Sequence, residues 1–172
     1  MDVSFLNSRK NAELGVFMPL CHPYTGVPLG SDDKAPGFLV RGEAAPSVQK
    51  RFAEMQKDAE GADAEDQDAI LEKMHNSLID TALDYIIEPR NLENDGKPVS
   101  TDEEIRAVLD MTFPEMGTAL AANGLPIMQA GDGKDGETIS VPKFELKNTT
   151  FAMQVNKFAT DGQRFLGEMP KG

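Results

Sequence analysis

The sequence has no tryptophan, one cysteine (Cys21), two histidines (His22 and His75) and no long hydrophobic run in its 172 residues. A single cysteine cannot form a disulfide within the chain, and no signal-peptide pattern opens the sequence. No apolar run approaches the ~18 residues that a membrane-spanning helix requires. The sequence therefore predicts a cytoplasmic protein without a membrane segment.

Basic residues are also scarce, because 17 lysines and arginines face 29 acidic residues, which gives a formal net charge of -12. Nucleic acids and anionic membranes bind basic faces that displace their counterions, so we expect neither as a partner. Eight acids gather in one stretch, which is either a solvated face or a surface that steers a basic segment of a partner. They are Glu54, Asp58, Glu60, Asp63, Glu65, Asp66, Asp68 and Glu72.

The chain also lacks the residue sets of known catalytic, metal and phosphate sites. Catalysis by Cys21 requires a base, an orienting acid and an oxyanion donor, and structural zinc usually requires four nitrogen or sulfur ligands. In the loop Asp132–Glu137, Lys134 stands where a calcium loop needs an oxygen ligand. We expect no catalytic, cofactor-binding or metal-binding residue, and we assign Cys21 and His22 to a turn and its packing.

The first third of the chain predicts an antiparallel strand pair. The candidate strands are Leu14–Leu20 and Gly37–Arg41, and Pro19 favours an edge position for the first. Between them, Pro23 fixes φ early in a bend and Gly26 permits a positive φ late in it. The hydrophobic content of 40% is enough for one moderate core.

The middle of the chain has helical periodicity. Apolar spacing predicts a short helix from Pro46 and a longer one with a wide apolar stripe that ends at Pro89. Thr101 and Glu104 have the spacing of a capping box, which predicts a third helix. Pro114 is expected to begin a further short helix over residues 114–120.

The C-terminal quarter contains the candidate partner-binding residues. An extended segment with an edge character is expected over Thr138–Leu146, because Pro142 interrupts it. The following segment, Thr149–Glu168, has apolar residues at near-helical spacing and follows the glycine-rich loop Gly131–Glu137, so we expect a detachable helical arm that binds a partner. Its apolar face consists of Phe151, Val155, Phe158, Phe165 and Leu166.

Together these patterns predict an α+β fold, with a small antiparallel strand pair packed with several helices and a mobile C-terminal helix. The expected organisation is a flexible N-terminal arm (1–13), an α+β domain (14–147) and a C-terminal helical arm (148–172). Five of the nine methionines could fill the core or form an adaptable surface for an apolar helix. These are Met55, Met74, Met111, Met116 and Met128.

The order of these motifs resembles that of phage tail assembly chaperones over most of the chain. The shared order is a hydrophobic strand, the turn His22-Pro-Tyr-Thr-Gly26, a second strand ending in Gly42, a helical middle, and Asp95-Gly-Lys-Pro98 before a capped helix. Proteins of this family often carry a tryptophan before the second turn, where the nearest aromatic residue of this chain is Tyr85.

The resemblance implies a non-catalytic protein of the host cytoplasm that needs no cofactor. It would bind the tape measure protein and keep it soluble while tail tube subunits polymerise around it, with the tail tube protein as a second partner and self-association as a further property. The alternative from another class is a structural virion protein of the phage tail or neck. An enzyme is disfavoured because the residue sets described above are missing.

Overall fold

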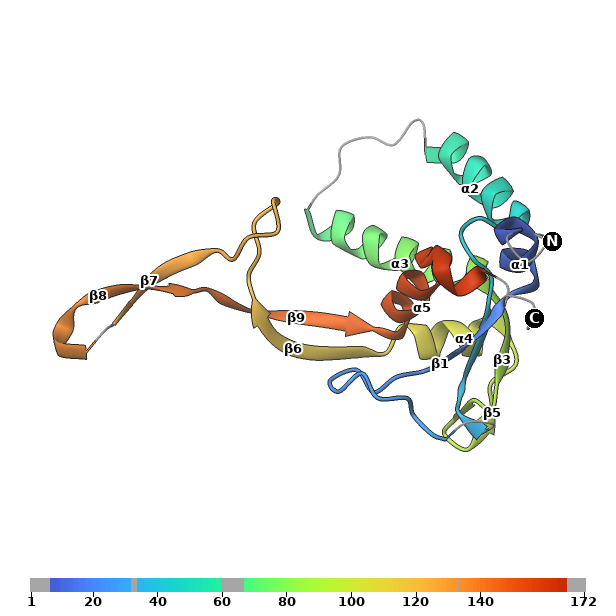
Figure 1. The fold of residues 1–172 in the computed structure, drawn as a ribbon, viewed down its shortest axis with the longest axis horizontal. Helices are drawn as coiled ribbons and strands as arrows, with labels where there is room; N and C mark the ends of the chain where they lie inside the picture. Colours follow the sequence, from blue (N-terminus) through green and yellow to red (C-terminus); the bar gives the residue numbers. More distant parts are fainter. Residues whose placement is uncertain (1–6, 32–33, 60–66, 133, 167–172) are drawn as a thin grey trace, which may run out of the picture. The chain divides into compact units, whose positions relative to one another are not determined.

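The structure, a computed structural model, describes residues 7–31, 34–59, 67–132 and 134–166. The chain divides into two compact units (Figure 1). We call Met1–Met111 with Thr150–Gly172 the core unit, and Thr112–Thr149 the ribbon unit. The described elements include helices and small antiparallel sheets, which confirms the predicted α+β class.

The core unit contains a three-stranded antiparallel sheet in the order β1 (Val16–Pro19), β2 (Gly37–Val40), β3 (Ile86–Arg90). Phe17 lies opposite Leu39, and Phe38 lies opposite Pro89. The predicted pair of strands is therefore confirmed, and β1 has the edge position that its proline indicates. A two-stranded hairpin of β4 (Glu93–Asn94) and β5 (Lys97–Pro98) follows β3.

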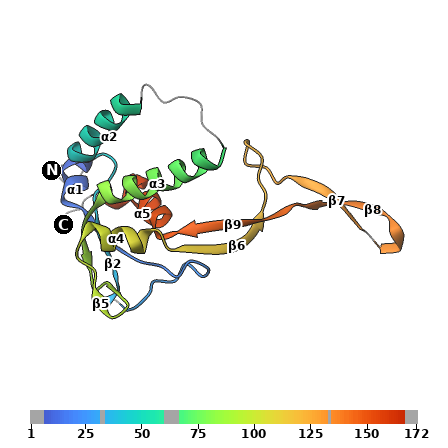
Figure 2. The same ribbon diagram turned by 180° about the vertical axis from the view of Figure 1, so that it is seen from behind.

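Helices complete the core unit: α1 (Ser8–Leu14), α2 (Pro46–Ala59), α3 (Gln67–Tyr85), α4 (Asp102–Leu109) and α5 (Phe151–Thr160), followed by the short helix η4 (Gly162–Phe165). In both opposite views α5 lies beside α3 (Figures 1 and 2). The Asn156 side chain of α5 donates a hydrogen bond of 3.0 Å to the Leu78 carbonyl of α3. Fully buried side chains of the sheet and helices form the core, among them Phe38, Val40, Ile79, Leu109 and Val155.

The C-terminal segment is part of this core, which corrects the expectation of a detachable arm. Phe151, Val155, Phe158 and Phe165 are buried, and only Leu166 of the predicted face is exposed. The amphipathic pattern predicts an apolar face, and the core covers this face because burial of large apolar side chains is the main stabilising contribution available to a small core. The structure divides the chain before Thr112 and before Thr150, whereas the sequence predicts boundaries after residues 13 and 147.

The N-terminal arm is likewise not free over its described part. Residues 8–14 form α1, Ala12 is fully buried, and the Gly42 amide donates a 3.0 Å hydrogen bond to the Ala12 carbonyl. Residues 1–6 lie outside the described residues. From Ser8 onwards, the expected flexible arm is instead a helix that packs on the core unit.

Two helix predictions also differ from the structure. The second predicted helix ends at Tyr85, and Ile86 begins β3 because its backbone pairs with Val40. Residues 114–120 do not form a helix, since they lie mostly in the strand β6. In contrast, the capping box is confirmed: Thr101 accepts a hydrogen bond from the Glu104 amide, and the Glu104 carboxylate accepts one from the Thr101 amide.

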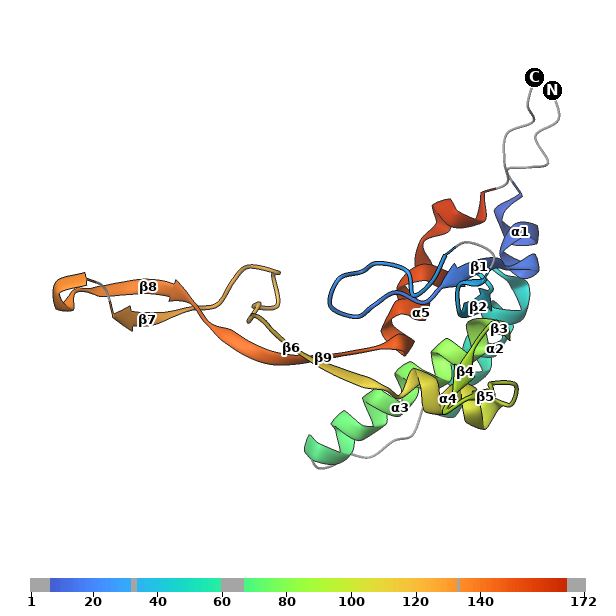
Figure 3. The same ribbon diagram turned by 90° about the horizontal axis from the view of Figure 1, so that it is seen from below.

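The ribbon unit is built from β6 (Thr112–Thr118) paired with β9 (Phe144–Thr150), and β7 (Met128–Asp132) paired with β8 (Thr138–Pro142) (Figure 3). Three backbone hydrogen bonds link Ala119, Ile127 and Lys143 where the two pairs meet. The predicted extended segment 138–146 is confirmed as β8 and the start of β9. No described helix of the chain is both long and apolar enough to cross a membrane.

Candidate functional site

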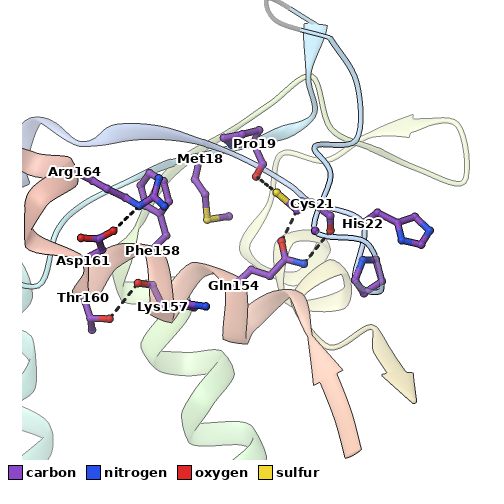
Figure 4. A pocket seen from close by; sticks show the side chains of 12 residues that line it. Met18, Pro19, Cys21, His22, Gln154, Lys157, Phe158, Thr160, Asp161 and Arg164 are labelled. Carbon is purple, nitrogen blue, oxygen red and sulfur yellow. Dashed lines mark hydrogen bonds and ion pairs between the residues drawn. The ribbon is translucent and has the colours of Figure 1, made fainter. Parts of the chain in front are cut away.

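The core unit has a pocket of about 660 Å³ between the 21–26 bend and helix α5 (Figure 4). Its apolar lining comes from Met18, Pro19 and Phe158, and its charged lining comes from Lys157, Asp161 and Arg164. The pocket is thus mixed in character and borders the 21–26 bend.

Gln154 of α5 holds the bend in place. Its Oε1 accepts a hydrogen bond of 3.1 Å from the Cys21 amide, and its Nε2 donates one of 2.9 Å to the Cys21 carbonyl. Beyond this clamp, the His22 amide donates to the Val27 carbonyl and the Gly26 amide donates to the His22 carbonyl, both at 2.8 Å. Gly26 has a φ of 68°, as its place late in the bend predicts.

The cysteine and histidine of the bend do not form a nucleophile and base. The Cys21 thiol lies 3.7 Å from the Pro19 carbonyl, and the His22 ring points away from the thiol (Figure 4). His22 Nδ1 accepts a hydrogen bond of 3.3 Å from the Tyr24 amide. Both residues therefore belong to the bend at 21–26, and His22 is not the base of the Cys21 thiol.

Arg164 of the pocket has two partners among the neighbouring side chains. Arg164 Nε lies 3.0 Å from a carboxylate oxygen of Asp161, and its guanidinium lies 4.5 Å from the centre of the Phe158 ring. Phe158 also meets the ring of Phe165 edge-on, with a centroid separation of 6.1 Å. This arrangement closes the end of the core around α5, so it stabilises the fold whether or not the pocket holds a ligand.

The remaining histidine, His75, lies in helix α3. His75 Nε2 lies 2.6 Å from Asp110 Oδ1, a contact between α3 and the end of α4. Among the described residues, no group of three or more histidine, cysteine or acidic side chains could hold a metal ion. The arrangement at His75 is that of a surface contact between helices.

Shifted pKa values occur at structural positions. Burial, with smaller effects from the nearby Glu43 and Asp84 carboxylates, raises the pKa of the Tyr85 phenol to about 12. The backbone amides of Thr101 and Ser100 stabilise the charged Glu104 carboxylate and so lower its pKa. These groups belong to the core and to the helix cap, so they do not indicate an active site.

Among the described residues, the ribbon unit carries eight of the fifteen exposed large apolar side chains. Ala119 is the one buried apolar residue among its described residues. Its exposed large apolar side chains are Met116, Leu120, Leu125, Ile127, Met128, Ile139, Phe144 and Leu146. Monomeric proteins seldom leave large contiguous apolar patches in water, so those of these side chains that share one face are candidates for a binding surface.

Three of these side chains share one face of the β6–β9 pair. A Cβ atom added to Gly117 would lie 3.3 Å from the Lys147 side chain, so Gly117 and Lys147 face the same side. Because neighbouring residues of a strand alternate, Met116, Phe144 and Leu146 face the other side. They are 63%, 59% and 64% exposed, and we call them the apolar ribbon face.

Three of the five methionines singled out in the sequence are exposed. Met74, Met116 and Met128 are half or more exposed, which favours the adaptable surface over core filling for these three.

Of the eight clustered acids, only Glu54 and Glu72 have described side chains, and both are exposed. Arg51 lies within 3.9 Å of Glu54 and 3.5 Å of Asp84.

Comparisons of the chain with protein-family models, curated proteins and solved structures find no match.

Proposed function

We propose that this protein is a non-catalytic phage tail assembly chaperone of the host cytoplasm, which binds the tape measure protein and assists assembly of the tail tube. The resemblance in motif order is the first support. The chain forms the two turns of this motif order, at 22–26 and at Asp95-Gly96, and the capped helix follows the second turn. The tail tube protein is a second proposed partner.

The exposed apolar ribbon face carries the proposal. A holder of long helices needs an apolar surface that adapts its shape, and Met116 supplies the flexible side chain beside Phe144 and Leu146. We propose that an apolar stripe of the tape measure protein packs on this face. This location replaces the C-terminal face predicted from the sequence, because four of its five residues are buried.

Co-expression with the tape measure protein of the same phage tests the proposal. The wild-type chain is expected to keep the tape measure protein in the soluble fraction and to co-purify with it. A triple variant, Met116→Ser, Phe144→Ser and Leu146→Ser, is expected to lose both effects, because polar side chains remove the apolar contact.

The matched control is Leu14→Ser, which changes a side chain of similar exposure (65%) in the core unit. Circular dichroism of each purified variant establishes that it is folded. A folded triple variant that still keeps the tape measure protein soluble would argue against the ribbon face. A wild-type chain without any effect would argue against the chaperone function.

A structural virion protein of the tail or neck is the second candidate. The open strand edges of the ribbon unit favour it, because strands with free edges join neighbouring subunits by strand addition. Quantitative mass spectrometry of purified virions separates the candidates. The chaperone is expected to be absent or scarce, whereas a virion protein would be present in proportion to the tail subunits.

A further inference from the structure

Within the part of the chain that the structure describes, one edge of strand β9 has no neighbouring strand. Within the described residues, β9 pairs only with β6, and the two strands form a two-stranded sheet. Two-stranded sheets in water are marginally stable, and exposed edges are templates for further pairing. The unit would therefore gain stability from an additional strand on the outer edge of β9.

Two hydrogen bonds establish which backbone groups point to that edge. The Lys143 amide donates to the Ile127 carbonyl at 2.7 Å, and the Lys143 carbonyl accepts from the Ala119 amide at 2.8 Å. Both groups of Lys143 thus point toward the paired side. Since the direction alternates along a strand, the backbone groups of Phe144, Leu146 and Asn148 point to the free edge.

We propose that β9 pairs antiparallel with β9 of a second copy of this chain, with Leu146 opposite its own counterpart. A two-fold axis normal to the sheet must place one residue of each strand opposite itself. With Leu146 at the axis, Phe144 lies opposite Asn148 of the second copy, and these outward-pointing groups form about six backbone hydrogen bonds.

Charge complementarity selects this register. With Leu146 at the axis, Glu145 lies opposite Lys147 of the second copy, and the same pair recurs by symmetry. These are non-hydrogen-bonded positions, where opposite side chains approach most closely. Lys147 Nζ donates to the Thr118 carbonyl at 2.7 Å on the β6 side, so pairing with Glu145 of the second copy requires the Lys147 side chain to turn toward the outer edge of β9.

The neighbouring registers are disfavoured by specific residues. With the axis at Glu145, the two Glu145 side chains face each other and Lys143 faces Lys147 of the other copy at two places. With the axis at Lys147, the two Lys147 side chains face each other. An axis at Phe144 places Pro142 opposite Leu146 at an outward-pointing position, where proline lacks the amide that the ladder needs. An axis at Asn148 runs the pair into helix α5, which begins at Phe151.

The inference does not rest on the proposed function, because Glu145 and Lys147 lie on the sheet face opposite Met116, Phe144 and Leu146. Pairing would bring the two apolar ribbon faces together on one side of a four-stranded sheet. A failure to dimerise and a failure to bind the tape measure protein are therefore observed in separate experiments.

Sedimentation velocity of the full chain at increasing concentration tests the pairing. The wild type is expected to dimerise. Glu145→Lys and Lys147→Glu should each weaken the dimer on the order of tenfold, because each turns two attractive pairs into two repulsive ones. An equimolar mixture of the two variants should dimerise again, since every pair in the mixed dimer is attractive.

Glu137→Lys is the matched control, because it makes the same charge change at an exposed residue between η3 (Lys134–Gly136) and β8, and it should dimerise like the wild type. A wild type that remains monomeric at its highest soluble concentration would overturn the proposal. A mixture no more dimeric than its two components would also overturn it.

Oxidative cross-linking provides a second readout in case Lys147→Glu disturbs the contact with Thr118. In a Cys21→Ser background, Leu146→Cys should form a disulfide-linked dimer, because hydrogen-bonded partners have Cα atoms about 5.5 Å apart. Phe144→Cys should not, because the two Cα atoms would lie at least about 13 Å apart in this register. Equal cross-linking at both positions would contradict the Leu146 axis.

Discussion

Replacing Phe158 by alanine tests whether α5 closes the core unit. Phe158 is buried, meets Phe165 edge-on and has the Arg164 guanidinium over its ring. Removing a buried phenylalanine costs about 3 to 5 kcal/mol, because the transfer energy is lost and a cavity remains. Domains of this size are stable by about 5 to 15 kcal/mol, so the variant should lose a large share of its stability.

The assay is urea unfolding followed by circular dichroism at 222 nm, since the chain has no tryptophan for fluorescence. Met153→Ala is the matched control on the same helix, because Met153 is 43% exposed and its replacement should change stability by no more than about 0.5 kcal/mol. A Phe158→Ala variant within about 1 kcal/mol of the wild type would refute the buried position of α5 and restore the detachable arm.

Four further predictions concern the bend, the core and the helix cap. Gln154→Met keeps the length of the side chain but removes both hydrogen bonds to Cys21. The variant should lower the free energy of unfolding by about 1 to 3 kcal/mol and speed hydrogen exchange of the Cys21 amide, and unchanged exchange would contradict the clamp. The pKa of Tyr85 is about 12 in the folded chain and 10.0 for an unperturbed tyrosine, so the unfolded chain loses this proton first as pH rises. Urea titrations should therefore find that stability falls as pH rises from 10 to 12, and Tyr85→Phe should reduce that fall. Thr101→Ala should cost about 1 kcal/mol by urea unfolding. The lowered pKa of Glu104 means that its stabilising effect is present above the unfolded pKa and is lost as pH falls through the folded value, so the stability difference between wild type and Glu104→Ala should shrink in acid.

Local chemistry explains which parts of the fold are predictable from the sequence. The bend at 22–26 and the capping box of α4 depend on residues a few positions apart, so their spacing is sufficient evidence. Pro19 likewise indicates an edge strand through its missing amide. The end of α3 is different, because Ile86 suits a helical stripe and a strand equally well, and pairing with β2 decides it.

The location of the candidate surface also depends on long-range packing. An amphipathic helix indicates that one face must be buried, but it does not indicate what covers that face. The apolar side of α5 is covered by the core unit, whereas the apolar side chains at Phe144 and Leu146 are left exposed. The alternation in residues 144–147 indicates a strand with one apolar face, whereas the extended segment predicted from the sequence ends at Leu146.

Hydrogen–deuterium exchange of the full chain, alone and with the purified tape measure protein, tests the proposed function most directly. Measurements at one fixed, low concentration of the chain limit any contribution from self-association. The account predicts slower exchange in β6 and β9 on addition of the tape measure protein, with α5 unchanged. Protection confined to the core unit, or binding without any change in residues 112–149, would contradict it.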